Sequence, residues 1–466
     1  MYGSGRRSAH AGRRIKKKSA GLPRAIAAFC GNRKAETMAN TPITAVIVGG
    51  GHRAVIYADY SLKHPDELKI VGIADPDPER REMCRLKYGF DKAHCFESAA
   101  ELAAVPRFAD AVINGTMDHQ HYDTSVPLLE KGYDMLLEKP FAVSEDEMRR
   151  LLDVIRKNGN KVMICHVLRY APFYLALKKR VASGQLGDIL NIQMAEHVSY
   201  HHLSTSYVRG KWANTDRSKT TMLLAKSCHD IDVMAWLMQP DKPVSVSSVG
   251  SIFQFKPENA PEGAGTRCTV DCPLVDSCRY SAKKIYLEHP DRWTCYAWAD
   301  LEHKKDQTEQ DRIESFKNGN PYNRCMYKCD NNVVDHQSVL VNFRSGATGT
   351  FNMVGGSAKS MRKIHIVGTL GEAYGVFEEN RFTVSMIEAD APSGYRDEIV
   401  DLNEAGSEGH GGGDDNLTAD FIRYLRTGEQ SVSCTAIENS VAGHLTVFKA
   451  DESREKGGQL VLIDLP

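Results

Sequence analysis

The sequence contains no hydrophobic run of the roughly twenty residues that a membrane-spanning helix requires, because charged residues or glycines interrupt every candidate. It also lacks a charge excess: 59 lysines and arginines stand against 60 aspartates and glutamates, a formal net charge of −1 at pH 7. Such a balance gives no case for binding to nucleic acid or to a membrane surface. The chain has 466 residues, more than a single hydrophobic core organises, so we expect two domains.

The N-terminal region has no apolar signal-peptide core, and no internal repeat is visible in the chain. Twelve cysteines are present, and several of them fall inside apolar strands or helices. Thiols in such positions are typical of a reducing compartment. We therefore expect a cytoplasmic protein.

Acidic residues are almost absent from residues 1–40, where ten lysines and arginines are opposed only by Glu36. Serine, glycine and alanine fill the gaps, so the segment buries too little apolar surface to fold by itself, and we expect a disordered basic extension. Three origins stay open: an upstream extension before a true start at Met38, an organelle-targeting peptide, or a functional basic arm.

A short apolar run at residues 45–48 leads into a glycine-rich turn and then into a helical pattern. A second apolar run ends in Asp75, so the segment predicts a strand–helix–strand unit with a dinucleotide-binding fingerprint. Gly49 permits the tight turn, and Gly51 lets the backbone approach a pyrophosphate. Asp75 would bind ribose hydroxyls and repel a 2′-phosphate, which favours NAD over NADP, whereas Arg53 could instead pair with such a phosphate. The candidate cofactor-binding residues of this unit are Gly49, Gly51, His52, Arg53 and Asp75.

The chain changes its pattern near residue 189. Over residues 44–139 short apolar runs alternate with helical patterns, which predicts a parallel, doubly wound sheet. From Ile189 onward the predicted strands are longer and follow one another through short turns such as Arg344-Ser345-Gly346, which indicates an antiparallel sheet.

We expect an α/β Rossmann domain that binds NAD at residues 41–165 and a substrate and oligomerisation domain at residues 166–466. The last predicted helices, at residues 414–427 and 435–451, would cover the second sheet or return to the first domain.

Further motifs follow the ends of predicted strands. One strand runs into the turn Thr116–His121, another into Glu138-Lys139-Pro140, and a later helix carries His229 and Asp232. With the glycine fingerprint, these motifs resemble the Gfo/Idh/MocA family of nicotinamide-dependent sugar oxidoreductases, from about Thr44 to the C-terminus. The resemblance implies an α+β C-terminal domain with a large open, mostly antiparallel sheet that often mediates oligomers. It also implies a small carbohydrate substrate and a homo-oligomer.

Lys139 and His229 are the predicted catalytic residues. An ammonium held at a strand end can donate to a substrate hydroxyl and polarise the C–O bond, and an imidazole can take the hydroxyl proton while hydride leaves. The alternatives are a surface lysine in a turn and a structural histidine. By the same resemblance, the cofactor-binding residues on the nicotinamide side are Thr116, Asp118, His121 and Glu138.

The residues before His229 depart from the family pattern. Many members carry an aspartate four residues before this histidine and a glycine two before it, whereas this chain has Ala225 and Ser227. Lys226 lies between them and would enter the site and alter its charge. The departure weakens the transfer of the complete inositol-dehydrogenase-like set of catalytic residues.

Other polar residues are candidates for the substrate pocket. Arg169 follows a predicted strand, with the alternative that it simply pairs with a carboxylate. Polar and aromatic side chains between His197 and Trp212 suit a sugar, although about half of them could belong to a solvated loop. The candidate substrate-binding residues are Arg169, Tyr170, Lys226, Asp232 and His336.

Several cysteines gather in a polar stretch of the second domain. Their spacings, C-x3-C and C-x5-C, are looser than the C-x2-C typical of zinc sites. Structural zinc, free buried thiols and disulfides all stay open, and the candidate ligands are Cys268, Cys272, Cys278 and Cys329. Cys228, beside His229, could be a nucleophile or could pack beneath the site.

Together these patterns predict an NAD-dependent dehydrogenase acting on a CH–OH group of a sugar, sugar acid or cyclitol. One alternative is a redox-neutral glycosidase, in which bound NAD oxidises a ring hydroxyl transiently, the glycosidic substituent is eliminated through the acidified neighbouring C–H, and the hydride is then returned. Another is a nucleotide-bound regulator without enzymatic activity.

Overall fold

Six parallel strands form the first sheet in a computed structural model, which describes residues 41–289, 294, 296–403 and 409–466. The predicted basic extension lies outside these residues, and the unit Pro42–Pro466 is described by itself. The strand order is β3-β2-β1-β4-β5-β6, which confirms the expected Rossmann domain. The strands are β1 (Ile43–Val48), β2 (Leu68–Ala74), β3 (Cys95–Phe96), β4 (Ala111–Asn114), β5 (Asp134–Leu137) and β6 (Val162–Ile164).

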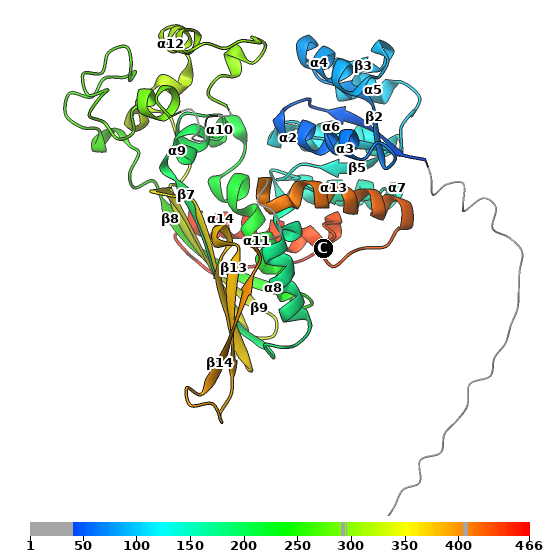
Figure 1. The fold of residues 1–466 in the computed structure, drawn as a ribbon, viewed down its shortest axis with the longest axis vertical. Helices are drawn as coiled ribbons and strands as arrows, with labels where there is room; N and C mark the ends of the chain where they lie inside the picture. The colour runs from blue at the N-terminus through cyan, green and yellow to red at the C-terminus, as the bar shows by residue number, and fades with distance from the viewer. Residues whose placement is uncertain (1–40, 290–293, 295, 404–408) are drawn as a thin grey trace, which may run out of the picture. The chain divides into compact units, whose positions relative to one another are not determined.

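Helices connect these strands and cover the sheet (Figure 1). The residues of β4 are all buried, so the strand needs cover on both faces. Local signals set helix ends: the Ser144 side chain accepts a hydrogen bond from the Glu147 N–H where α7 begins, and Gly159, with φ of 73°, ends it. The helices are α2 (His52–Ala58), α3 (Tyr60–Lys63), α4 (Pro78–Tyr88), α5 (Ala99–Ala104), α6 (His121–Glu130) and α7 (Glu145–Asn158).

Nine strands form the second sheet, in the order β14-β13-β12-β11-β7-β10-β9-β8-β15. Its neighbouring strands are antiparallel except for β7 and β10, which run parallel. The expected large and mostly antiparallel sheet is therefore confirmed. The strands are β7 (Ile189–Ser199), β8 (Pro243–Ser251), β9 (His336–Phe343), β10 (Thr348–Ser357), β11 (Met361–Gly368), β12 (Gly371–Val376), β13 (Arg381–Ile387), β14 (Tyr395–Asp401) and β15 (Val461–Leu462).

Helices pack on one face of this second sheet. Alternate residues of β7, including Ile192, Met194 and Val198, are buried against them, as the two-residue period of a strand requires. The covering helices are α8 (Pro172–Ala182), α11 (Cys228–Met238) and α14 (Ile437–Glu455) (Figure 1). The opposite face of the sheet carries no helix in the described part of the chain.

Residues 252–335 separate β8 from β9 and contain no strand among the residues that the structure describes. We call this segment the insert. It carries α12 (Glu309–Lys317) and several single helical turns, and it has a small hydrophobic cluster of its own. The members of this cluster are Cys268, Ala282, Ile285, Tyr286, Ala297, Phe316 and Tyr322.

Helix α13 (Gly409–Thr427) packs on the first domain. Its residues Leu417 and Phe421 are buried in the same hydrophobic cluster as Ala45 and Ile47 of β1. The Ile164 N–H of β6 also donates a hydrogen bond to the Thr435 carbonyl. A late part of the chain therefore completes the core of the nucleotide-binding sheet.

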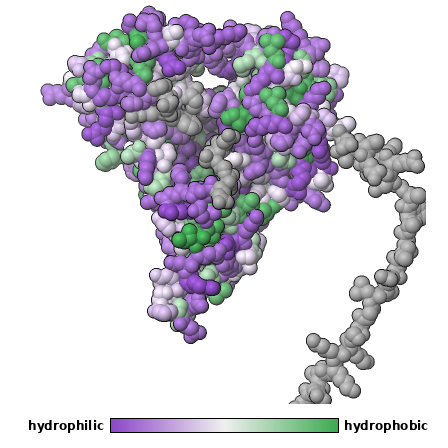
Figure 2. Space-filling model, in the orientation of Figure 1, coloured by the Kyte–Doolittle hydropathy of each residue, from purple (hydrophilic) through white to green (hydrophobic). Residues whose placement is uncertain are grey.

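The face seen in Figure 2 is mostly hydrophilic, with hydrophobic residues scattered among polar ones. Within the described residues, no helix combines the length and the apolar character needed to cross a membrane.

Candidate active site

The glycine turn after β1 leaves room for a ligand to approach the backbone closely. Gly49 has φ of +79°, and a Cβ atom placed on it would lie 2.9 Å from the Thr116 backbone nitrogen. A Cβ atom placed on Gly51 would meet no protein atom within 4 Å, so the backbone there faces open space. This arrangement fits a dinucleotide, whose pyrophosphate occupies the space that a side chain would otherwise fill.

Asp75 fixes the shape of this turn. One carboxylate oxygen accepts the Gly50 N–H at 2.7 Å, and the other accepts the Asp77 N–H at 2.8 Å. The side chain is buried at the carboxyl end of β2, where the strand order places the adenosine ribose in this fold. Each oxygen keeps a second lone pair for a ribose hydroxyl.

Arg53 forms ion pairs with two carboxylates of the protein. Its Nε lies 3.0 Å from Glu138 Oε1, its Nη2 lies 2.6 Å from Asp414 Oδ1, and it also contacts the Tyr57 hydroxyl. Burial would raise the pKa of Glu138, but the charges of Arg53 and Lys139 hold it below the ordinary value. Because its charge is already balanced, Arg53 does not stand as a ready partner for a 2′-phosphate.

The turn after β4 is held from two sides. Asp118 accepts a hydrogen bond of 2.8 Å from Trp212 Nε1, so Trp212 links the second domain to this turn. The fully buried His121 ring contacts two backbone carbonyls, with Nδ1 2.7 Å from Pro140 and Nε2 3.1 Å from Thr116. His121, predicted to contact the cofactor, thus acts on a cofactor site through the backbone that it braces.

Lys139 reaches the residues that precede His229. Its Nζ donates a hydrogen bond of 2.8 Å to the Ala225 carbonyl, and its N–H donates to Glu138 Oε2. Ala225 lies in a π-helical turn, Leu223–Ser227, directly before α11. Such turns release carbonyls from the regular helical pattern and are frequent at functional sites. Lys139 therefore contacts the turn that leads into the helix of His229.

His229 packs against a second histidine, His166. Its ring packs edge-on against His166, with 5.7 Å between centroids. Burial lowers the pKa of His166 to about 4, with a further lowering by Arg169 and Lys139 that Asp232 opposes. Burial also raises the pKa of Cys228 to about 12, which favours a thiol that packs beneath the site over a nucleophile.

Arg169 and Asp232 form a buried ion pair with each other. Two hydrogen bonds of 2.7 and 2.6 Å join them, and each side chain is only 1% exposed. Tyr170 is likewise buried, with its hydroxyl 2.8 Å from Asp420 Oδ2. The structure favours the alternative that Arg169 pairs with a carboxylate, as a buried guanidinium requires, and it gives no support to substrate binding by these three residues.

Lys226 enters a buried charge network. Its Nζ lies 3.1 Å from Glu196 Oε1, while the Arg362 Nε lies 2.6 Å from Glu196 Oε2 and 2.9 Å from Asp230 Oδ1. Burial lowers the pKa of Lys226, and burial together with Glu196 raises that of Asp230 to about 6 against the effect of Arg362. Asp230 follows His229 directly, so the network holds the backbone next to the predicted acid–base residue.

His336 lies on the wrong face of the second sheet for the predicted pocket. It pairs across β10 with Val354, which pairs with His197 of β7. Glu196, the partner of Lys226, is the neighbour of His197 and so points to the opposite face. The prediction of His336 as a substrate-binding residue is corrected, because strand register turns its ring toward Asp335 and away from the helices.

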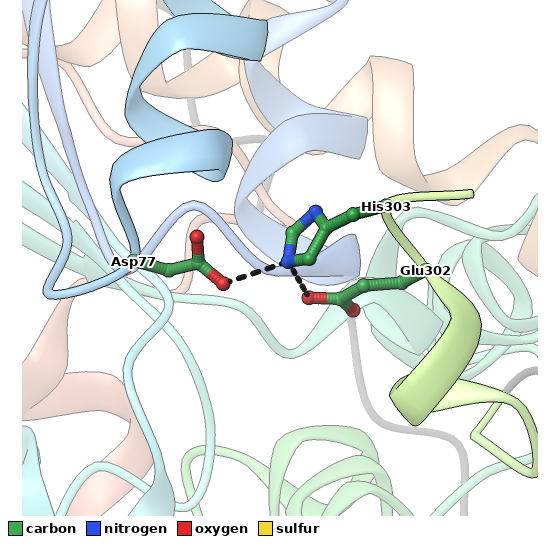
Figure 3. A group of neighbouring side chains, drawn as sticks. All are labelled: Asp77, Glu302 and His303. Carbon is green, nitrogen blue, oxygen red and sulfur yellow. Dashed lines mark hydrogen bonds and ion pairs between the residues drawn. The ribbon is translucent and has the colours of Figure 1, made fainter. Parts of the chain in front are cut away.

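The insert contacts the first domain, and the sequence did not predict this contact. Figure 3 shows His303 between Glu302, its neighbour in the insert, and Asp77, which precedes α4. The His303 Nε2 lies 2.9 Å from Asp77 Oδ2, and Arg80 Nη2 lies 2.7 Å from Glu302 Oε1. These residues are partly exposed, and they tie the insert to the segment just after Asp75.

The predicted cysteine ligands do not form a closed zinc site. The cysteines of the described residues are free thiols, and no three of their sulfur atoms come within 4.8 Å of one another. Cys329 turns away, with its Sγ 3.2 Å from the Cys325 carbonyl. Cys325 takes the place beside Cys268, Cys272 and Cys278 that sequence analysis gave to Cys329.

Comparison with known proteins decides the family. A model of an oxidoreductase family with an NAD-binding Rossmann fold matches residues 43–166, and the model of its C-terminal alpha/beta domain matches residues 178–441. The chain belongs to the Gfo/Idh/MocA oxidoreductase family. This confirms the predicted resemblance, and with it an NAD-binding oxidoreductase.

Gfo/Idh/MocA relatives of this chain include enzymes named for sugars and cyclitols. The oxidoreductase YteT of Bacillus subtilis (strain 168), described as putative, is 23% identical over 382 residues, which are 76% of this chain and 82% of that protein. Inositol 2-dehydrogenase of Klebsiella pneumoniae (strain 342) is 30% identical over 28% of this chain and 36% of that enzyme. D-glucoside 3-dehydrogenase of Escherichia coli (strain K12) is 28% identical over 33% of this chain and 42% of that enzyme.

Solved Gfo/Idh/MocA structures show the same fold. Levoglucosan dehydrogenase in complex with NADH and levoglucosan superposes with a TM-score of 0.66 at 16% identity, over 91% of this chain and 100% of that one. An inositol dehydrogenase homolog from Azotobacter vinelandii, complexed with NADH and myo-inositol, superposes with a TM-score of 0.62 at 16% identity, over 91% of this chain and 98% of that one.

Proposed function

We propose that this protein is an NAD-dependent dehydrogenase that oxidises a ring hydroxyl of a sugar, sugar acid or cyclitol. The observation that carries the proposal is the position of Lys139, whose Nζ lies 2.8 Å from the Ala225 carbonyl just before the helix that bears His229. This contact brings Lys139, at the carboxyl end of a parallel strand, to the segment that precedes His229, and such strand ends are where this fold binds its dinucleotide. The relatives named for inositol and D-glucoside support the substrate class.

Each residue has a defined task in this proposal. The Lys139 ammonium donates to the substrate hydroxyl and stabilises the negative charge that grows on its oxygen. His229 takes the hydroxyl proton. NAD, when bound, supplies the hydride acceptor, so the CH–OH group becomes a ketone. The high pKa of Cys228, about 12, keeps a thiolate from neutralising Lys139.

The same proposal favours NAD over NADP. The buried Asp75 carboxylate would repel a 2′-phosphate, and Arg53 is paired with Glu138 and Asp414. With His52, Thr116 and the glycine turn, these residues would hold the dinucleotide.

Substitution of Lys139 tests the proposal. We expect Lys139→Met to lower the rate of NADH formation by about 10²-fold or more, since it removes a donor aimed at developing charge. NAD affinity, measured by calorimetry, should stay within about twofold because the Lys139 ammonium is bonded to the Ala225 carbonyl and is assigned no contact with the pyrophosphate. Lys131→Met, an exposed residue of the same domain, is the matched control. Unchanged turnover in Lys139→Met would remove this residue from the mechanism.

The glycosidase alternative is separated by a parallel assay. Purified protein receives NAD with a panel of sugars, polyols and aryl glycosides, and both NADH absorbance and aglycone release are followed. NADH that accumulates with product supports the dehydrogenase. Aglycone release without net NADH would establish the redox-neutral reaction, and binding of NAD without any turnover would establish a regulator.

We also propose that a second copy of the chain covers the open face of the second sheet. This face exposes large apolar side chains, with Leu340 43%, Tyr374 49% and Val249 56% exposed. Burial of such a surface favours association. Light scattering should find an oligomer, and Leu340→Lys with Tyr374→Glu should yield monomers, whereas a monomeric wild-type protein would refute the idea.

A cytoplasmic location completes the proposal. It is supported by the ten described cysteines, all of which are free thiols. Fractionation of the producing cells tests it, and recovery in an oxidising compartment would contradict it.

A further inference from the structure

A pocket of about 400 Å³ lies between the insert and the segment at residues 209–217. Positive charge dominates its described lining, although the chain as a whole has a formal net charge of −1. The charged lining residues are Arg209, Lys211, Arg217, Arg267, Arg324 and Asp330. A hollow lined by charges of one sign attracts ions of the other, so this pocket is a candidate site for an anion.

Asp330 is the one carboxylate in the described part of this lining, and two arginines already share it. Its Oδ1 lies 2.6 Å from Arg324 Nη1, and its other oxygen contacts Arg217. The hydrogen bond from Arg217, together with Arg324, holds the pKa of Asp330 well below its ordinary value. The carboxylate is therefore ionised and used, and it leaves the charges of Arg209 and Arg267 unbalanced within the described lining.

Two cations of the pocket are held next to each other. Arg209 Nε donates to the Arg324 carbonyl at 2.7 Å, and Arg324 Nη2 donates to the Arg209 carbonyl at 3.0 Å. Arg209 is 1% exposed. Its other acceptors in the described residues are neutral: the Tyr280 carbonyl, the Ser204 hydroxyl and the Cys268 sulfur. A buried cation beside a like charge is unfavourable, and an anion in the pocket would offset that cost.

Arg267 and Arg217 have N–H groups that an outside acceptor can use. Arg267 Nη2 donates to the Phe316 and Asn320 carbonyls at 3.1 and 2.7 Å, which holds the side chain, while its Nε and Nη1 meet no acceptor in the described part of the protein. Arg217 bonds to Asp330 through Nη1. Its Nε and Nη2 remain as a planar fork, the geometry that matches two oxygens of an oxyanion.

The charge of the lining favours a dianion over a carboxylate. A phosphate monoester carries about two negative charges at neutral pH and three acceptor oxygens, whereas a carboxylate carries a single charge and two oxygens. The volume of about 400 Å³ also falls in the range of small-molecule sites, so a group attached to the phosphate has room.

Lys211 lies close to both the pocket and the proposed cofactor site. It lines the pocket, and its Nζ lies 4.9 Å from the centroid of the Trp212 ring, whose Nε1 donates to Asp118 at 2.8 Å. Burial lowers the pKa of His52 beside the glycine turn, and the charge of Lys211 contributes to this lowering. A dianion in the pocket would therefore reduce the positive charge near the glycine turn.

We propose that this pocket binds a phosphate group, either as inorganic phosphate or as the ester of a small sugar. Arg217 and Arg267 donate to the phosphate oxygens, Arg209 and Arg324 supply charge behind them, and Asp330 holds Arg217 in place. The site is separate from Lys139 and His229, so the proposal does not depend on the proposed dehydrogenase activity.

The test is calorimetry of the full chain at low ionic strength with inorganic phosphate, D-glucose 6-phosphate and, as the uncharged control, D-glucose. We expect inorganic phosphate to bind with a Kd on the order of 1 mM or lower, and to bind more weakly as sodium chloride screens the charges. Similar affinity for the two phosphates would assign the site to the free ion. Binding of the ester about tenfold more tightly would assign it to a phosphorylated sugar.

Variants of the lining give opposite signs. Arg217→Gln and Arg267→Gln should each weaken phosphate binding about tenfold, because each removes a charged donor. Asp330→Asn should tighten it about threefold, since it removes the carboxylate that competes for Arg217 and Arg324. The matched control is Arg279→Gln, an exposed arginine of the insert outside the described lining, which should leave binding unchanged.

The exposed positions keep the test decisive even if Arg267→Gln fails to fold, because Arg217 and Asp330 are both exposed. Absence of phosphate binding to the wild-type chain at about 10 mM would overturn the proposal. Weaker binding in Asp330→Asn, or an equal loss in Arg279→Gln, would also overturn it, since the pocket would then not be the place where phosphate binds.

Discussion

Removal of one member of the Arg169–Asp232 pair should destabilise the folded chain rather than weaken substrate binding. Two bonds of 2.6 and 2.7 Å join the side chains, and each is 1% exposed. Arg169→Met leaves the Asp232 carboxylate buried without its cation, and an uncompensated buried charge costs about 3–5 kcal/mol. We expect the free energy of unfolding of the domain to fall by that amount.

Urea titration followed by tryptophan fluorescence measures this loss. Trp236 is a local reporter, because its ring centroid lies 5.7 Å from the Arg169 guanidinium carbon. The control is the double variant Arg169→Met/Asp232→Leu, which removes both charges and should recover most of the stability. Its KM for the sugar should stay close to that of the wild type. If Arg169→Met unfolds like the wild type while the double variant raises KM, the pair binds substrate and does not stabilise the fold.

The remaining predictions concern acid stability and the cofactor site. The pKa of His166 is about 4 in the folded chain and 6.5 in the unfolded chain. The folded chain therefore keeps its full free energy of unfolding above pH 6.5 and loses about 3 kcal/mol of it as the pH falls toward 4. His166→Gln should make the urea midpoint less dependent on pH between pH 5 and 7. Gly51→Val should weaken NAD binding tenfold or more in calorimetry with little change in melting temperature, since its side chain would enter the open space. Gly49→Ala should instead lower the melting temperature, because its Cβ would lie 2.9 Å from a backbone nitrogen. If Gly51→Val lowered the melting temperature and left NAD binding unchanged, the turn would hold no cofactor. Asp75→Asn, which keeps an acceptor but loses the charge, should raise the ratio of NADP to NAD turnover, and an unchanged ratio would place coenzyme choice elsewhere.

The nucleotide-binding features could be predicted because they are local. The glycine turn, the acid at the end of β2 and the Glu138-Lys139-Pro140 turn each depend on neighbours within one strand–helix–strand unit. The alternation of β7 likewise indicated one buried face. These elements are encoded by residue types at short spacing, so the sequence alone shows them.

The partners of buried charges could not be predicted, because tertiary packing chooses them. Arg53 pairs with Asp414, 361 positions away, and Arg169 pairs with Asp232, 63 positions away. Spacing says nothing about such pairs, and a charged residue near a strand end therefore looked like a substrate ligand. His336 was misplaced for a related reason: only strand register, fixed by β10, decides which sheet face its ring occupies.

The return of the chain onto its first sheet has a consequence for synthesis. Leu417, Phe421 and Ala436 share a hydrophobic cluster with Ala45 and Ile47, and β6 pairs its Ile164 N–H with the Thr435 carbonyl. During synthesis, the first strands therefore leave the ribosome long before the C-terminal residues that pack on them. The early helices α2, α3 and α4 cover only part of this face of the nucleotide-binding sheet, so we expect the rest to stay exposed until nearly the whole chain has emerged, and to stay exposed in a fragment that ends at residue 165.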